Sequence, residues 1–212
     1  MVTDNGQPTF APIVGNTLLE NARVVASRTD ILPLLPKDIT FAEVGVALGD
    51  FTAQVLNTCV LRQFIAIDRF DLEKYPNMWN GRVGKELRGH THHDFYKSHF
   101  KKHIDDGLLT MMVGDSVRCL RDLPDKSVDV FYVDANHSYK NVKSEIEVIE
   151  QKIKQTGLII FNDYMMFDWL GNEKYGVVQA VNEFMIEKQW ELVYFALHPG
   201  MFCDVAVRKL KR

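Results

Sequence analysis

The stretch from residue 39 to residue 50 reads ITFAEVGVALGD and indicates how the rest of the chain is organised around it. Residues 39–46 form an apolar run with few charges, which is typical of a strand buried on both faces of a parallel sheet. The small residues Gly45, Ala47 and Gly49 then allow a sharp turn and a close approach of the backbone to a ligand. A helix predicted over 51–61 follows this turn, and its N-terminus favours a carboxylate or another anion.

The remaining chain alternates between predicted strands and predicted helices. This alternation predicts a doubly wound, mostly parallel α/β sheet. The last two strands are joined by a tight turn at His198-Pro199-Gly200, which can connect only antiparallel neighbours. The sequence therefore predicts a Rossmann-like, seven-stranded sheet that ends in an antiparallel β-hairpin. Its strands are expected at 39–46, 63–68, 108–113, 127–135, 157–161, 191–197 and 202–209, and its later helices at 141–155 and 175–190.

The length of 212 residues suffices for one α/β core and falls short of two full domains. We expect an N-terminal helical cap over 1–37, with an amphipathic helix at 16–28. The catalytic domain then spans 38–212 and carries an insert at about 69–106. The sequence predicts a single domain overall.

The first part of that insert, residues 69–89, is too long for an ordinary connection and is predicted to be a binding loop or a lid. Tyr75 and Trp79 are candidates for walls of the site or for packing within the lid. Asp94 is predicted to cap a helix that runs to about residue 104. Three neighbouring histidines, His90, His92 and His93, suggest a zinc site, but no cysteine partner is evident and adjacent residues 92 and 93 rarely point the same way. Zinc is therefore not expected, and the role of these histidines is left open.

Composition excludes several classes of protein. The chain is 46% hydrophobic and 25% charged, which is ordinary for a globular enzyme. A formal net charge of −3 gives the surface no general attraction to phosphate backbones, so nucleic acid is not expected as a partner. No apolar run reaches the roughly 20 residues that span a bilayer, so no membrane segment is expected.

The cysteines and the start of the chain predict a cytoplasmic protein. Cys59, Cys119 and Cys203 are odd in number and contain no C-x-x-C pair, which argues against a disulfide framework or a thiolate zinc site. Residues 1–10 are polar and lack the basic and apolar regions of a signal peptide.

Acidic residues follow two further predicted strands. Asp68 ends the strand at 63–68, where a carboxylate can accept hydrogen bonds from two ribose hydroxyls. Asp115 follows the strand at 108–113, where an adenine would lie. Each of these acids taken alone is also typical of a turn or a helix cap. Because they follow successive strands at one edge of the sheet, they and the glycine turn together outline a nucleoside site.

A second group of polar residues follows the predicted strands at 127–135 and 157–161. Asp134, Asn162 and Asp163 can supply three oxygen ligands from adjacent strand ends, which suits a hard cation such as Mg²⁺. Caps of loops and helices are the alternative role for these three residues. His137 lies three residues after Asp134, and its ordinary pKa of about 6.5 suits a general base at neutral pH. A packing or hydrogen-bonding role is the alternative for this histidine.

On these residues the chain resembles the class I S-adenosylmethionine (SAM)-dependent methyltransferases, from about residue 38 to residue 209. The first motif of that family is an acidic residue followed by Gly-x-Gly-x-Gly, and here it starts at Glu43 and has Ala47 in place of the middle glycine. The resemblance implies SAM as the cofactor, with Glu43 near the methionine amino group, Asp68 on the ribose and Asp115 on the adenine amine. The cofactor-binding residues that it implies are Glu43, Gly45, Ala47, Gly49, Asp68, Asp115 and Asp134.

The second group is similar to residues of two kinds of O-methyltransferase. Catechol-type enzymes carry an Asp-Asn pair after the fifth strand, which appears here in reverse order as Asn162 and Asp163. They carry a catalytic lysine at the place of His137. Bacterial macrocin-type sugar O-methyltransferases carry a similar D-x-x-H-x-Y after the fourth strand, which reads here from Asp134 to Tyr139. The resemblance implies metal-assisted methylation of a small-molecule hydroxyl, with His137 as the base.

Three other functions fit the same pattern less well. A nicotinamide-dependent oxidoreductase would share the sheet but usually shows G-x-G-x-x-G, whereas this turn spaces its outer glycines as G-x-x-x-G. An aminopropyltransferase shares the sheet and carries an acidic pair for its polyamine, which His137 beside Asp134 fits less well. A non-enzymatic binding module would not gather ionisable side chains at strand ends. The acceptor and the oligomeric state, including a homo-oligomer, are left open.

Overall fold

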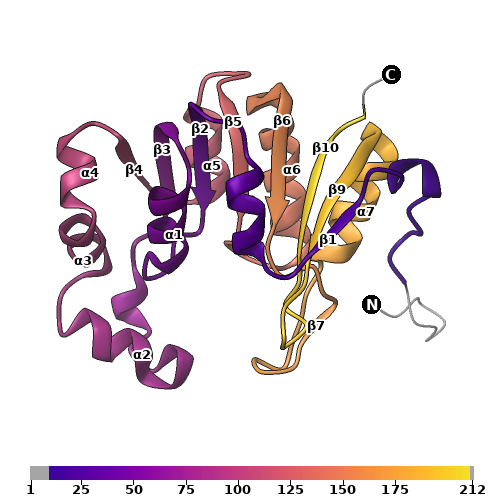
Figure 1. Ribbon diagram of the computed structural model, residues 1–212. Coiled ribbons are helices and arrows are strands. Elements are labelled where there is room, and N and C mark those ends of the chain that lie inside the picture. Colours follow the sequence, from indigo (N-terminus) through magenta and orange to yellow (C-terminus); the bar gives the residue numbers. More distant parts are fainter. Residues whose placement is uncertain (1–9, 211–212) are drawn as a thin grey trace.

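Eight strands form one sheet at the centre of the structure, a computed structural model that describes residues 10–210 (Figure 1). Their order in the sheet is β1-β9-β10-β6-β5-β2-β3-β4. β10 runs antiparallel to both of its neighbours, and the other pairs in this sheet are parallel. The strands are β1 (Arg23–Val25), β2 (Ile39–Val44), β3 (Leu61–Asp68), β4 (Leu109–Val113), β5 (Val128–Val133), β6 (Ile153–Phe161), β9 (Trp190–Ala196) and β10 (Asp204–Lys209).

The sheet confirms the predicted fold class and the C-terminal antiparallel hairpin. It contains one strand more than the seven predicted, because β1 pairs in parallel with β9 at the edge of the sheet. The helix predicted over 16–28 is wrong: this segment forms a short 3-10 helix, η1 (Asn16–Leu18), and then β1. The backbone of β9 offers an unpaired edge, and pairing with that edge overrides the helical spacing of the apolar residues.

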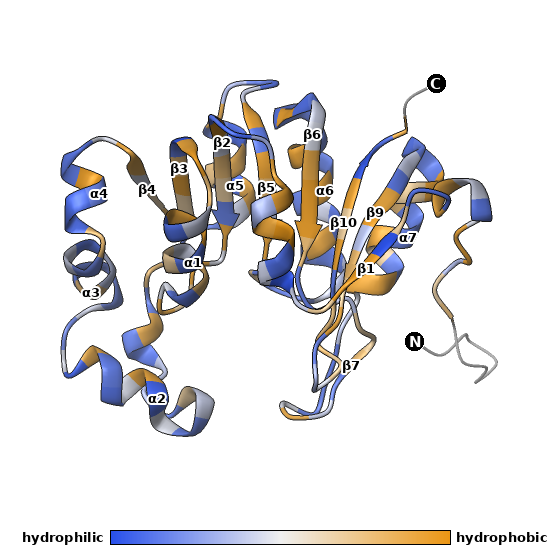
Figure 2. Ribbon diagram, in the orientation of Figure 1, coloured by the Kyte–Doolittle hydropathy of each residue, from blue (hydrophilic) through white to orange (hydrophobic). Residues whose placement is uncertain are grey.

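Two layers of helices cover the sheet. One face packs against α5 (Ser116–Asp122), α6 (Tyr139–Lys152) and α7 (Val177–Lys188). The other face packs against the 3-10 helix η2 (Arg28–Leu34), α1 (Asp50–Thr58), α3 (His92–His99) and α4 (Lys101–Asp105). Figure 2 shows the central strands as largely hydrophobic and the outer helix surfaces as largely hydrophilic, as a doubly covered sheet requires.

Strand β2 shows how the period of a strand distributes side chains between the two layers. All six of its residues are buried. Ala42 and Val44 contact the layer of α5, α6 and α7, whereas Phe41 contacts the layer of α1 and η2. Since alternate residues share a face, Glu43 also points toward α1. This orientation determines which side chains Glu43, the first residue of the motif, can contact.

Two segments project beyond the edge to which the parallel strands point (Figure 1). One is the insert, with the 3-10 helix η3 (Leu72–Lys74) and α2 (Met78–Leu87), which is interrupted at residues 79–81 by left-handed backbone. The other is a small hairpin of β7 (Phe167–Asp168) and β8 (Glu173–Lys174), which the sequence did not predict. The division into 1–37 and 38–212, with an insert at 69–106, stays a prediction.

The helix predicted to begin at Asp94 begins earlier. The N-cap of α3 is Thr91, whose side chain accepts a hydrogen bond from the backbone N–H of Asp94. Threonine fits this position because its hydroxyl oxygen satisfies a free N–H of the first turn. The segment that was predicted to form one helix to about residue 104 forms two helices, because α3 ends at His99 and α4 starts at Lys101.

None of the helices within residues 10–210 combines the length and the apolar character needed to cross a membrane. Residues 1–9, which form most of the stretch predicted to lack a secretion signal, lie outside the described range.

Candidate active site

The carboxyl ends of β2, β3, β5 and β6 lie along one edge of the sheet, the lower edge in Figure 1. Backbone hydrogen bonds continue past the strands and hold the following loops together. The N–H of Gly45 donates to the carbonyl of Ile67 over 2.8 Å, and the N–H of Asp134 donates to the carbonyl of Val44 over 2.7 Å. The structure therefore brings the glycine turn and the loop that carries Asp134 side by side.

The glycine turn is a cradle that side chains would fill. Gly45 has a φ of +86°, and a Cβ built on it would overlap the backbone carbonyl of Asp134. Gly49 has a φ of +88° and is the N-cap of α1. Ala47 stands where the family has its middle glycine, and it also adopts a positive φ, +46°. A non-glycine residue in this region is strained, so its neighbours must hold it there.

His92 is one of the residues that hold this strained turn. Its side chain is fully buried, and its Nε2 lies 2.5 Å from the carbonyl oxygen of Ala47. Its Nδ1 lies 4.0 Å from Oδ1 of Asp68. The backbone N–H of His92 donates to the carboxylate of Glu73. The insert is therefore anchored to the glycine turn through a histidine whose role the sequence alone did not indicate.

Glu43, the acidic residue of the first motif, faces helix α1. It is 1% exposed, and Oε2 accepts a hydrogen bond of 2.5 Å from the hydroxyl of Thr52. That hydroxyl is also 2.9 Å from the hydroxyl of Tyr96. Burial raises the pKa of Glu43 well above its usual value, against the opposing effect of the Thr52 hydrogen bond. Glu43 thus links β2 to α1 and α3, and its predicted place near the methionine amino group stays a prediction.

Asp68 lies at the end of β3 beside the glycine turn. Its Oδ2 accepts a hydrogen bond from the backbone N–H of Val46 over 2.9 Å, and its Oδ1 accepts one from Phe70 over 2.7 Å. A carboxylate can accept about four hydrogen bonds, so this pair of contacts orients the group and leaves positions for two hydroxyls. The arrangement fits the ribose contact predicted for Asp68.

Asp115 caps helix α5 and is exposed. Its side chain accepts a hydrogen bond from the backbone N–H of Arg118 over 3.1 Å. The next residue, Ser116, donates from its hydroxyl to Oε1 of Glu145 on helix α6 over 2.5 Å. Asp115 therefore performs the capping role that its sequence position also allows, and its predicted contact with adenine stays a prediction.

Glu145 is a buried carboxyl group that the sequence analysis did not single out. It is 1% exposed, and its Oε2 has no hydrogen-bond partner among the described residues. Burial raises the pKa of this group to about 7. The hydrogen bond from Ser116 and the charge of His137 lower the pKa, and the charge of Asp115 raises it. The folded protein therefore holds a proton on Glu145 over a pH range in which the unfolded chain has lost it.

This difference predicts a pH-dependent effect of Glu145→Gln on stability. A carboxyl pKa raised from 4.5 to about 7 contributes stability that is fully present below pH 4.5 and is lost as the pH rises to 7. At pH 8 the neutral glutamine should make the folded state more stable than wild type, by about 3 kcal/mol at most. The difference should disappear toward pH 4.5. Urea unfolding at both pH values measures it. Glu147→Gln, which changes an exposed residue of the same helix, is the control. Equal stability of Glu145→Gln and wild type at pH 8 would contradict the prediction.

His137 lies between two carboxylates at the strand ends. Its Nε2 is 3.5 Å from Oδ1 of Asp134 and 3.8 Å from Oδ2 of Asp163. Its ring stacks on Tyr175 with centroids 4.5 Å apart, and the backbone N–H of Gly176 donates to its carbonyl. Burial lowers the pKa of His137, but its carboxylate neighbours prevail and raise the pKa above its usual value. Burial raises the pKa of Asp163 to about 6.

The three predicted magnesium ligands do come together, but they surround this imidazole. Asn162 is buried, and its Nδ2 donates to Oη of Tyr132 and to Oδ1 of Asp204, both over 3.1 Å. Within residues 10–210, no group of three or more His, Cys, Asp or Glu side chains is placed to hold a metal ion. Because an imidazole nitrogen lies between the two aspartates and the amide serves the Tyr132 network, the residues do not fit a magnesium site as they stand. Their role as metal ligands stays a prediction.

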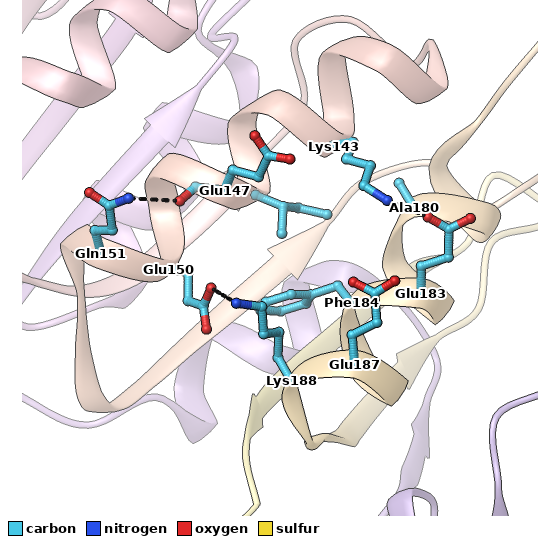
Figure 3. Close-up of a pocket in the computed structure, with 10 residues that line it drawn as sticks. Lys143, Glu147, Glu150, Gln151, Ala180, Glu183, Phe184, Glu187 and Lys188 are labelled. Carbon is cyan, nitrogen blue, oxygen red and sulfur yellow. Dashed lines mark hydrogen bonds and ion pairs between the residues drawn. The ribbon is translucent and has the colours of Figure 1, made fainter.

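A groove opens on the helical layer (Figure 3). It has a volume of about 310 Å³ and is formed by α6 and α7. An ion pair of 2.8 Å between Lys188 and Glu150 crosses it. None of the predicted site residues lines the groove, so the candidate site remains at the strand ends. The residues that line it are Lys143, Ile146, Glu147, Glu150, Gln151, Ala180, Glu183, Phe184, Glu187 and Lys188.

A doubly wound sheet with a reversed last strand, a glycine turn after its first central strand and an acid after the next is the architecture of class I SAM-dependent methyltransferases. The chain belongs to a family of this class, because a family model described as a methyltransferase domain matches residues 42–164. Family membership implies SAM as the cofactor. The residues present fit it: a Cβ would fill the cradle at Gly45, and the carboxylate of Asp68 faces the same turn.

Individual relatives are distant. An uncharacterized protein of Acanthamoeba polyphaga mimivirus is 20% identical over 153 residues, which are 72% of this chain and 62% of that protein. A protein from Corynebacterium glutamicum has a similar structure, with a TM-score of 0.60 and 11% identity over 95% of this chain and 85% of the other. The B. subtilis tRNA methyltransferase TrmK gives a TM-score of 0.57 and 12% identity, over 88% of this chain and 67% of that one. At these identities the two structures support the fold alone.

Proposed function

We propose that this methyltransferase transfers the methyl group of SAM to a hydroxyl of a small molecule, with His137 as the general base. The observation that carries the proposal is the place of His137 at the strand ends, between Asp134 and Asp163. A hydroxyl is a poor nucleophile until its proton leaves, so O-methylation needs a base at this place. SAM, when bound, supplies a methyl group on a positively charged sulfur.

The carboxylates favour one tautomer of His137. Because Nε2 faces Asp134 and Asp163, a proton on Nε2 is favoured there, and the lone pair stays on Nδ1. In the reaction the acceptor oxygen forms a bond to the methyl carbon while the carbon–sulfur bond breaks, and Nδ1 takes the hydroxyl proton. The two carboxylates then stabilise the imidazolium ion. The stacked ring of Tyr175 holds the imidazole plane in place during this step.

The acceptor class can be tested directly. TrmK is a tRNA methyltransferase, so a nucleic acid is the alternative acceptor to a small molecule. Radiolabelled SAM should transfer its label to members of a panel of sugars, phenols and other hydroxyl compounds, and mass spectrometry should show an O-methyl product. Bulk tRNA and rRNA in the same assay should remain unlabelled. Label in RNA alone, or an N-methyl product, would count against the proposal.

We propose Asp68 as the ribose-binding residue, and its loss should weaken cofactor binding. Asp68→Ala removes the acceptor of two ribose hydroxyls, and hydrogen bonds to a charged group contribute about 1.5–3 kcal/mol. S-adenosylhomocysteine affinity measured by calorimetry should therefore fall by roughly 10- to 150-fold. Asp71→Ala is the matched control, because Asp71 pairs instead with Arg69 and Lys74. Wild-type affinity in Asp68→Ala would place the ribose elsewhere.

A further inference from the structure

Arg28 reaches over the strand ends from the N-terminal segment, outside the part of the chain that the family model matches. Its guanidinium carbon lies 4.9 Å from the centre of the Phe51 ring and 5.8 Å from that of Tyr132. Its Nη1 donates to Oη of Tyr132 over 2.7 Å. Two aromatic faces and one hydrogen bond therefore fix the guanidinium before any ligand binds, which lowers the entropy cost of a further contact.

Most donors of this guanidinium remain free for a ligand. Arginine has five N–H donors, and within the described part of the chain the one hydrogen bond of Arg28 goes to Tyr132. The nearest carboxylate oxygen in that part, Oδ2 of Asp134, lies 3.9 Å away, beyond hydrogen-bond reach. The side chain is 36% exposed. Arg28 thus forms an ion pair with Asp134 at 3.9 Å, but within the described residues no carboxylate accepts a hydrogen bond from it.

The free side of Arg28 borders a hollow of about 270 Å³ beside the glycine turn. Such a volume suits one end of a cofactor rather than a whole one. A second arginine borders the hollow, but Arg82 is already paired with Asp50 at 2.7 Å and with Glu86 at 2.5 Å. Arg28 is therefore the cation that the hollow offers to an anion. The residues that line the hollow are Arg28, Val46, Ala47, Asp50, Phe51, Trp79 and Arg82.

We propose that Arg28 binds the carboxylate of the methionine part of SAM. The turn from Gly45 to Gly49 brings the cofactor to the same hollow, and a planar guanidinium matches a carboxylate with two parallel hydrogen bonds. The proposal rests on SAM as the cofactor and is independent of the acceptor. It also gives the site a preference for SAM over its decarboxylated form, the donor in aminopropyl transfer. An N-terminal residue thereby favours methyl transfer over the related reaction of the same fold.

Calorimetry with two ligands tests this assignment. Arg28→Met keeps an unbranched side chain and removes the charge and the N–H donors of the guanidinium, which lies over Phe51. It should weaken S-adenosylhomocysteine binding by about tenfold to a hundredfold. It should leave unchanged the affinity for 5′-methylthioadenosine, which lacks the amino and carboxylate groups. Arg28→Lys, which keeps the charge without the fork, should give an intermediate affinity for S-adenosylhomocysteine. Arg62→Met is the control, because Arg62 pairs with Asp129 and does not line the hollow, and it should bind both ligands as wild type does.

Three results would overturn the proposal. Equal weakening of both ligands in Arg28→Met would show that Arg28 only supports the fold of the site. Unchanged S-adenosylhomocysteine affinity together with a higher KM for the acceptor would show that Arg28 binds an anionic acceptor instead. If Arg28→Met does not fold, the wild-type protein decides: equal affinity for S-adenosylhomocysteine and its decarboxylated analogue excludes a carboxylate contact. Since binding is measured without an acceptor, these results are independent of the proposed O-methylation.

Discussion

His137→Ala should lower kcat for methyl transfer to the acceptor by about 10²- to 10⁴-fold, the usual contribution of a positioned general base. The reason is that the acceptor hydroxyl would keep its proton while its oxygen attacks the methyl carbon. S-adenosylhomocysteine affinity should barely change, because the cofactor contacts proposed for Asp68 and Arg28 come from other segments. Steady-state kinetics with the acceptor found in the panel, together with calorimetry, separate the two effects.

The control for this variant is His90→Ala, which removes an exposed histidine of the insert and should leave kcat unaltered. Thermal unfolding of His137→Ala is needed as well, since the ring stacks on Tyr175 and its loss removes packing. A folded variant with nearly wild-type kcat on the true acceptor would make His137 a structural residue that connects the β7–β8 hairpin to the strand ends. The assignment to the methyltransferase class would still hold in that case, and another residue would have to act as the base.

Gly45→Ala should destabilise the protein by about 2–5 kcal/mol and abolish measurable cofactor binding. An alanine at this φ of +86° costs about 1–2 kcal/mol in backbone strain. Its Cβ would also overlap the carbonyl of Asp134, and overpacking typically costs a further 1–3 kcal/mol. The clash is with backbone, so it can be relieved only by moving β5 away from the glycine turn.

Gly89→Ala separates the cost of backbone strain from the cost of steric overlap. Gly89 has nearly the same φ, +85°, but a Cβ built on it meets nothing within 4 Å. This variant should therefore show only the strain, about 1–2 kcal/mol, with normal affinity for S-adenosylhomocysteine. Urea unfolding and calorimetry of both variants measure the comparison. Similar losses of stability and of binding in the two variants would mean that the close approach of Gly45 to Asp134 has no special importance.

Local signals in the sequence were sufficient for most of the fold. The apolar run at 39–46, the turn at Gly45 to Gly49 and the alternation that follows predict a parallel sheet, because burial on both faces imposes an unbroken apolar strand. The tight turn at 198–200 predicts the reversed last strand, because so short a connection can join only antiparallel neighbours. Polar residues at strand ends follow directly, since parallel strands all end at one edge. These features depend on residues close together in the chain.

The other features of the fold and of the site were decided by the tertiary structure alone. They depend on contacts between segments that are far apart in the chain. β1 exists only because β9, more than 160 residues later, leaves an edge to pair with. Arg28 and Tyr132 are 104 residues apart, and His92 and Ala47 are 45 apart, so no motif links them. Whether Asp134 and Asp163 face a metal or the ring of His137 likewise depends on side-chain placement within a few ångströms, which residue types and spacing do not specify.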